Sequence, residues 1–344
     1  MPKANLSKLE AFRVASVVSG RAVRNSIQAR FGRFRSWPDD SMLISEPLAM
    51  AEERTDRLRR IYANAGRDLW DGPTVFREAM QKHGGIQLSP EKRVALAQPI
   101  TDLMWGELGA WIVAAELAER LEDPDARLAA SSQVFDEARH FYTLRDYLAA
   151  LHVPPPRIDP YFAVAARRLL ATRDLTIKLF AMQILAEGAA VVIFRFLLEN
   201  KLEPVLSELL PYFERDEARH VALGVLYLPQ RLKRLSVRKL KRIRNTTYGI
   251  GDLLGAAQLR NARHFHTLGL EPRDLIRSAD KMLFELSQKI GPIPGTDLWF
   301  FPTNPTDNPG YEKALDIIAP ARDQPPSFWA RRARNLLDYG AALF

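Results

Sequence analysis

The pentapeptide Asp-Glu-Ala-Arg-His occurs twice in this chain, at residues 136–140 and again at residues 216–220. The two copies are 80 residues apart. The same shift superimposes further residues: Glu107 on Glu187, Leu117 on Leu197, Glu119 on Glu199, Pro124 on Pro204 and Tyr147 on Tyr227. An internal repeat of this kind indicates one supersecondary unit used twice. The unit is a pair of helices joined at a turn that proline marks, so two units predict a four-helix bundle.

Helical patterns dominate the rest of the chain, which predicts an all-α protein. Gly and Pro lie at the edges of the apolar stretches rather than at strand-like spacing. The expected helices cover residues 45–70, 73–83, 89–121, 124–151, 160–171, 174–200 and 204–228, then a basic helix, and finally a helix near 327–342. We expect the helix over 204–228 to end at Pro229. The segment after Gly291 is rich in Pro, Gly and Asn and is expected to run over the surface.

The repeat places acidic residues and histidines where they can meet. Residues three apart share a helix face, so the Glu and His of each pentapeptide point the same way. A further Glu lies about 15 residues before each turn, and the pentapeptide Glu lies about 15 after it, which brings them level in antiparallel helices. Glu116 is excluded because it lies about 13 Å along the axis from Glu107. The predicted metal ligands are Glu107, Glu137, His140, Glu187, Glu217 and His220.

Apolar neighbours surround these carboxylates and indicate that they face the core. Trp111 follows Glu107 at helical spacing, and Ile184 and Val191 flank Glu187 in the same way. A buried carboxylate needs a partner, and four of them need the charge of two divalent cations. A Glu from each of two helices and a Glu-x-x-His from each of two others is the ligand set of di-iron and di-manganese bundles. Oxygen and imidazole ligands suit both metals.

The residues next to these ligands predict a supporting layer. A metal-binding imidazole usually donates its other N–H to a carboxylate or carbonyl. Asp136 and Asp216 each precede a ligand Glu, and we expect each to orient the imidazole of the opposite half. Arg139 and Arg219 either pair with these carboxylates or face solvent. The sequence alone leaves both arrangements open.

Residues of about 89–230 resemble the ferritin-like di-iron carboxylate superfamily. The resemblance is to its oxygen-activating branch, most nearly the monooxygenase hydroxylases and the acyl-carrier-protein desaturases. It implies a ferritin-like four-helix bundle with additional N- and C-terminal helices. It also implies two iron ions, or one iron and one manganese, with O2 as co-substrate, an electron donor protein and an assembly such as a homodimer. The chain departs from several subfamilies at single positions. Leu144 stands where ribonucleotide reductase subunits typically have a radical tyrosine, and Val191 stands where many hydroxylases have a threonine. Phe213 stands where the N-oxygenases have a third histidine.

We divide the chain into a basic N-terminal arm (1–40), a ferritin-like di-metal bundle (41–230) and a C-terminal helical extension that packs on the bundle (231–344). Some 115 residues after the bundle are enough to cover a substrate pocket. Residues one turn from the ligand glutamates are candidates to line it, although core packing explains each of them equally well. These candidates are Leu103, Ala110, Trp111, Gln183, Val191 and Phe194.

Composition and charge bound the cellular setting. The chain has 344 residues, 47% of them hydrophobic, and no Cys, which excludes disulfides, thiol nucleophiles and Cys-ligated metal centres. No apolar run approaches the roughly 20 residues of a membrane span, and we expect a cytoplasmic protein. Residues 1–36 hold eight Lys or Arg and one acid, Glu10, and residues 229–245 hold eight Lys or Arg and no acid. These segments either dock an acidic partner or a membrane surface, or are solvated helix faces. No motif for sequence-specific nucleic-acid binding is present.

Three classes of function remain. The leading one is an O2-activating di-iron oxygenase or oxidase that hydroxylates, desaturates or N-oxidises a small organic or carrier-bound substrate. A second is iron oxidation or peroxide removal as in ferritins and erythrins, which needs no substrate pocket. A third is a partner-binding scaffold stabilised by a structural metal. Substrate-dependent O2 consumption, mineral formation and metal-independent partner binding would distinguish them.

Overall fold

The computed structural model describes residues 52–295, 299–301, 304–323 and 327–342. The described residues belong to one compact unit. The predicted basic arm over 1–40 lies outside the described residues. Among the described residues every regular element is a helix, and the predicted all-α class is confirmed.

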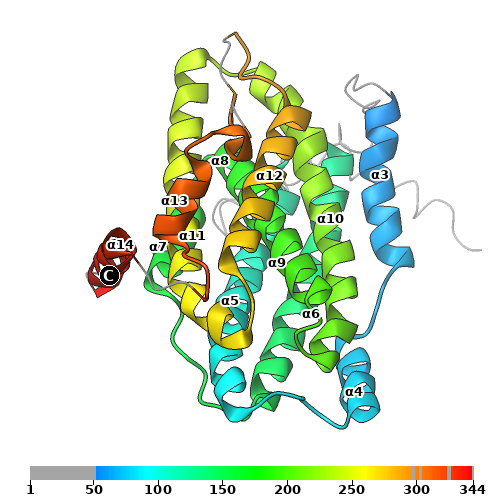
Figure 1. The fold of residues 1–344 in the computed structure, drawn as a ribbon. Coiled ribbons are helices and arrows are strands. Elements are labelled where there is room, and N and C mark those ends of the chain that lie inside the picture. The colour runs from blue at the N-terminus through cyan, green and yellow to red at the C-terminus, as the bar shows by residue number, and fades with distance from the viewer. Residues whose placement is uncertain (1–51, 296–298, 302–303, 324–326, 343–344) are drawn as a thin grey trace, which may run out of the picture. The chain divides into compact units, whose positions relative to one another are not determined.

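Two helical hairpins form the centre of the compact unit (Figure 1). The first is α5 (Pro90–Arg120) followed by α6 (Pro124–Ala150). The second is the continuous run α8 (Leu175–Leu179), η1 (Phe180–Ala186) and α9 (Glu187–Glu199), followed by α10 (Pro204–Lys233). α6 and α10 begin alike, with an acidic cap whose carboxylate accepts backbone N–H groups and a proline in the first turn. The repeat seen in the sequence therefore corresponds to the two hairpins.

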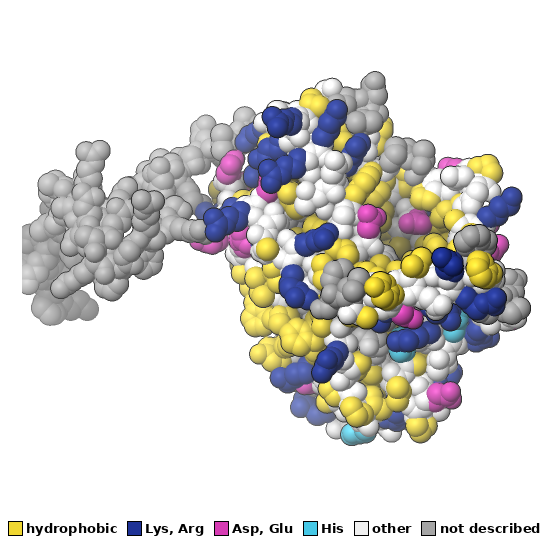
Figure 2. Space-filling model, turned by 90° about the vertical axis from the view of Figure 1, so that its left-hand side faces the viewer, with side chains coloured by type: hydrophobic (Ala, Val, Ile, Leu, Met, Phe, Trp, Pro, Cys, Tyr) yellow, Lys and Arg dark blue, Asp and Glu magenta, His cyan; other side chains and the backbone are white. Residues whose placement is uncertain are grey.

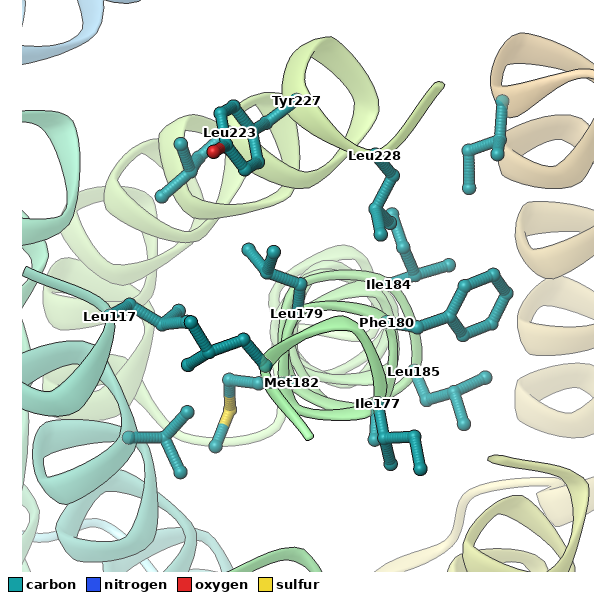
Figure 3. Packing of buried hydrophobic residues seen from close by; sticks show 14 of the residues in the cluster. Leu117, Ile177, Leu179, Phe180, Met182, Ile184, Leu185, Leu223, Tyr227 and Leu228 are labelled. Atoms are coloured by element: carbon teal, nitrogen blue, oxygen red, sulfur yellow. The ribbon is translucent and has the colours of Figure 1, made fainter. Parts of the chain in front are cut away.

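The first helical run of the second hairpin is buried on all sides, since every residue from 175 to 185 is buried. Figure 3 looks along this segment, and the side chains of Ile177, Leu179, Phe180 and Met182 project from it in different directions. Residues 180–186 form a π-helix that ends directly before Glu187. A helix that is apolar on all sides is a buried helix or a membrane span. Leu175–Glu199 is long and apolar enough to cross a membrane, but 83% of its most apolar window is buried inside the protein. The expectation that no apolar run is long enough to span a membrane is therefore wrong. This run packs in the core of the protein.

The remaining helices surround the two hairpins. α3 (Glu52–Arg67) packs on α6 and α10, and α4 (Gly72–His83) lies at the end of the same side (Figure 1). α7 (Pro160–Ala171) and α11 (Val237–Leu268) pack on α5, while α12 (Pro272–Ile290) packs on α9. The chain ends with η2 (Pro305–Asp307), α13 (Tyr311–Ile318) and α14 (Phe328–Ala342). α7, α11 and α12 position the cavity described below.

The predicted end of one helix was wrong. α10 does not stop at Pro229 but continues to Lys233, so the domain boundary drawn at 230 falls inside this helix. A proline costs one backbone hydrogen bond inside a helix. Contacts of the last turn offset this cost, because Leu232 is buried and Arg231 donates a hydrogen bond to Thr176 Oγ1 at 2.8 Å. For the helix expected over 45–70, the described part begins at Glu52 and ends at Arg67.

Candidate metal centre

Six side chains from the two hairpins converge in the bundle core. They form two overlapping groups of buried ligands. We call the group of Glu107, Glu137, His140 and Glu217 the His140 position. We call the group of Glu137, Glu187, Glu217 and His220 the His220 position. The ligand atoms within each group lie within 4.8 Å of one another, so the structure brings together all six residues predicted from the repeat.

Both imidazoles point Nδ1 toward the carboxylates. His140 Nδ1 lies 3.0 Å from Glu217 Oε1 and 3.5 Å from Glu107 Oε2. His220 Nδ1 lies 2.8 Å from Glu217 Oε2 and 3.2 Å from Glu137 Oε1. Glu137 and Glu217 belong to both groups, each with one oxygen nearer to each histidine. Glu137 and Glu217 would therefore contribute to both positions if two cations were bound.

The opposite ring nitrogens face aspartates across the repeat. His140 Nε2 lies 3.2 Å from Asp216 Oδ2, and His220 Nε2 lies 3.3 Å from Asp136 Oδ2. Each aspartate therefore serves the histidine of the other half, as expected from the sequence. An Nε2–H donated to a carboxylate leaves Nδ1 free as a metal ligand.

Two arginines and a tryptophan hold the aspartates. Arg139 donates to Asp136 and, at 2.7 Å, to Asp216 Oδ2. Arg219 donates to Asp216 Oδ1 at 2.6 Å and to Asp136 Oδ2 at 3.1 Å. Both arginines are buried, which rules out the solvent-facing alternative. Trp70 Nε1–H donates to Asp216 Oδ2 at 2.8 Å, and the guanidinium of Arg139 lies over its ring.

The electrostatics show that the ligand set lacks positive charge. Burial raises the pKa of Glu107 well above the usual value for glutamate, and Glu217 raises it further. Burial and the charge of Glu137 do the same to the pKa of Glu187. Burial also disfavours ionised Glu137, but His220 and His140 outweigh it and hold its pKa well below the usual value. Four buried carboxylates can ionise together only with compensating positive charge.

The donor atoms fit divalent cations. Glu137 Oε2, His140 Nδ1 and Glu217 Oε1 are buried and make no hydrogen bond, although they point toward one another. Buried polar atoms without partners are rare and need an explanation. Carboxylate oxygens and imidazole nitrogens at this spacing suit iron or manganese.

Two residues that support the site escaped the sequence reasoning. Gln133 donates hydrogen bonds to Glu137 Oε1 and Glu187 Oε1, both at 2.7 Å. Gln133 lies four residues before Glu137 and so shares its helix face. A polar residue at that position of a buried face could have predicted a contact with the ligands. Trp70 lies between α3 and α4, outside the repeat, and no pattern pointed to it. Glu116, excluded from the ligand set, pairs with the buried Lys178 at 2.5 Å.

A cavity of about 760 Å³ reaches the metal centre from the side of α7, α11 and α12. Glu107 and Glu187 form part of its wall, and most of the other lining side chains are apolar. Of the six candidate pocket residues, Leu103 and Ala110 line the cavity.

The other four candidate pocket residues are not in the cavity wall: Trp111, Gln183, Val191 and Phe194. Gln183 instead donates to Gln133 at 2.8 Å, and Phe194 packs edge-on against Phe213. The prediction failed because helical spacing identifies the stripe that carries the ligands. The side of that stripe on which a cavity opens depends on α7, α11 and α12, which lie outside the repeat.

The fold matches solved structures of R2-like ligand-binding oxidases. One mutant of such an oxidase with an aerobically reconstituted Mn/Fe cofactor has a TM-score of 0.55 at 16% identity, covering 74% of this chain and 99% of that chain. A second Mn/Fe mutant has a TM-score of 0.56 at 17% identity with the same coverage. A mutant with an Fe/Fe cofactor has a TM-score of 0.54 at 16% identity, again with the same coverage. No protein-family model and no curated protein matches the chain. The chain therefore has the helical fold of these oxidases, and the predicted ferritin-like bundle fold is confirmed.

Proposed function

We propose that this protein is an O2-dependent oxidase or oxygenase with two iron ions, or one iron and one manganese, that acts on an apolar organic substrate. The observation that carries the proposal is the cavity, because its mainly apolar wall includes two of the six ligand carboxylates, Glu107 and Glu187. A substrate held there has its reacting carbon next to the metal positions. The Mn/Fe and Fe/Fe cofactors named for the structural neighbours support the same metal content.

The residues of this chain have defined parts in such a reaction. When bound, the metals would transfer electrons to O2. Asp136 and Asp216 hold the two imidazoles with Nδ1 toward the metals, and the apolar wall excludes water and binds the substrate. Insertion of one oxygen atom into a C–H bond consumes O2, two electrons and two protons and releases water. The electrons come from a donor protein, which is part of the proposal.

The cavity also separates this proposal from iron storage or peroxide removal. Those activities need a path for ions or peroxide and have no use for a large apolar chamber at the ligands. Pockets with a few polar groups in a mainly apolar wall are typical of sites for organic ligands.

A cavity-blocking variant tests the proposal. Gly255 of α11 lines the cavity, and a Cβ at this position would meet no atom within 4 Å. The Fe(II)-loaded protein is mixed with O2 and a set of medium-chain alkenes and alcohols, and products are identified by mass spectrometry. We expect an oxygenated or desaturated product from the native protein and much less from Gly255→Phe, with the iron content of both unchanged. Repeated Fe(II) oxidation to a mineral without any organic product would show iron handling instead.

A further inference from the structure

A buried amide joins two of the ligand carboxylates. The two N–H bonds of the Gln133 side chain go to Glu137 Oε1 and to Glu187 Oε1, and each contact measures 2.7 Å. Gln133 is 1% exposed, so water does not compete for these bonds. Both accepting carboxylates belong to the His220 position, and Glu137, which also belongs to the His140 position, turns its other oxygen, Oε2, toward His140. Glu137 Oε1 is also the oxygen of Glu137 that faces His220, at 3.2 Å from its Nδ1.

A second amide fixes the orientation of the first. Gln183 Nε2 donates to Gln133 Oε1 at 2.8 Å, and Gln183 is fully buried. When cations are bound and both carboxylates are ionised, they only accept hydrogen bonds, so the NH2 group of Gln133 faces them and its oxygen faces Gln183. Gln183 belongs to the π-helix, and Gly224 of α10 lies so close that a Cβ there would come within 2.6 Å of Gln183 Cβ. The backbone of α10 at Gly224 therefore packs against Gln183 and restricts the position of the two amides.

The internal repeat breaks at these two residues. The residue 80 positions after Gln133 is Phe213, and the residue 80 positions before Gln183 is Leu103. On that side Phe213 stacks on the ring of His140, with 4.5 Å between ring centroids. Among the described residues, no amide donates to Glu107, which occupies the place of Glu187 in the other half. The two halves share their ligands and the aspartates and arginines behind the histidines, but in the part of the chain that the structure describes only one half has an amide behind its glutamates.

We propose that Gln133, held by Gln183, is a positioning residue that makes the two metal positions unequal by fixing Glu137 Oε1 and Glu187 Oε1, which belong to two of the three carboxylates of the His220 position. This inference rests on the proposed function, because it requires that the centre binds two metals. Preorganised ligands lose less freedom when a cation binds, and loss of such outer partners typically costs tenfold to a hundredfold in metal affinity. The His220 position is therefore the tighter one, and the His140 position, whose Glu107 accepts no amide hydrogen bond among the described residues, is the one that can adjust.

Anaerobic titration with Co(II) tests the inference, since the visible absorption of Co(II) reports both affinity and ligand geometry. We expect the native protein to bind two equivalents in separate steps. In Gln133→Met the tighter step weakens by roughly tenfold to a hundredfold and its absorption changes, while the other step stays in place. Phe213→Leu, at the matching position of the other half, leaves the tighter step unchanged. Gln183→Leu, which frees the Gln133 amide, gives the same shift as Gln133→Met but a smaller one.

Histidine variants assign the affected step. His140→Ala leaves the His220 position, and there the addition of Gln133→Met should weaken the remaining equivalent. His220→Ala leaves the His140 position, and there the addition should have little effect. Equal weakening in both backgrounds, or none in either, would overturn the inference while leaving a two-metal centre intact. Failure of the native protein to bind Co(II) would overturn the proposed function as well.

Discussion

At the scale of single residues, the site depends on which positive charge accompanies each buried carboxylate. Arg139 and Arg219 neutralise Asp136 and Asp216, and both arginines are buried with them. Among the described residues, the ligand glutamates contact imidazoles, the Gln133 amide and one another, and none of them pairs with a Lys or Arg. The structure thus separates two kinds of acid in one core. The aspartates are neutralised by the chain itself, and the glutamates are left for metal ions.

Asp102, which is not a metal ligand, tests how burial changes the pKa of a carboxyl group in this core. Burial raises the pKa of Asp102 to about 6, although Asn261, the backbone N–H of Asp159 and Gln98 donate hydrogen bonds that oppose the shift. A carboxyl whose pKa is raised on folding binds its proton more tightly in the folded state. Its stabilising contribution is present below about pH 4 and is lost as the pH rises through 6.

We therefore expect a difference in pH dependence between the native protein and Asp102→Asn. From pH 4 to pH 7 the native protein should lose about 2–3 kcal/mol of unfolding free energy relative to the variant, whatever the offset between them. Urea unfolding at a series of pH values measures this. Parallel stability curves for the two proteins would show that Asp102 keeps an ordinary pKa.

At the scale of helices, the sequence predicted the parts that repeat and missed the parts that tertiary contacts decide. The two hairpins could be predicted because prolines mark their turns and the ligands lie at matched distances from these turns. The π-helix over 180–186 could not, because its residues read as an ordinary apolar helix. The continuation of α10 past Pro229 depends on contacts of Leu232 and Arg231 with other elements. The cavity depends on α7, α11 and α12, whose packing no repeat specifies.

Gly224 tests whether α10 must approach the π-helix closely. A Cβ at this position would lie 2.6 Å from Gln183 Cβ and 3.0 Å from Ile184 Cδ1. Since the obstacle includes the base of a buried side chain, we expect Gly224→Ala to lower the unfolding free energy by about 1–3 kcal/mol. Gly109→Ala in α5 is the matched control, because nothing lies within 4 Å and alanine favours helix by up to about 1 kcal/mol. Equal effects of the two substitutions in thermal or urea unfolding would contradict this packing.

At the scale of the whole molecule, basic side chains gather at one end of the face shown in Figure 2, above a largely hydrophobic surface. The segment 229–245 supplies part of this charge at the start of α11. Two of its cations have acidic partners. Lys239 Nζ lies 3.6 Å from Asp174 Oδ2, and Arg234 Nη1 lies 3.5 Å from Glu122 Oε2. In the described part of the chain, the other six cations of this segment have no acidic partner: Arg231, which donates to Thr176, Arg244, which lies over the ring of Tyr248, and Lys233, Arg238, Lys241 and Arg242. The docking role of this segment stays a prediction.

Charge reversal tests that prediction. We expect the native protein to bind phosphatidylglycerol vesicles but not phosphatidylcholine vesicles, and to be released by salt. The triple variant Arg238→Glu, Lys241→Glu, Arg242→Glu should bind at least several-fold more weakly in a sedimentation assay. A control that reverses three exposed charges elsewhere, Lys281, Lys289 and Lys313, should bind almost as the native protein does. Equal binding by the two variants would identify residues 229–245 as a solvated helix face.

The metal content of the purified protein tests the central claim most directly. Protein produced with iron and manganese both supplied is analysed by mass spectrometry beside Glu137→Ala, Glu217→Ala and the control Glu116→Ala. Glu137 and Glu217 each belong to both metal positions, whereas Glu116 pairs with Lys178 outside them. We predict about two metal ions per chain in the native protein and in Glu116→Ala, and almost none in the other two variants. Metal-free native protein, or equal metal in all four, would show that the repeated pentapeptide is structural and that the centre binds no metal.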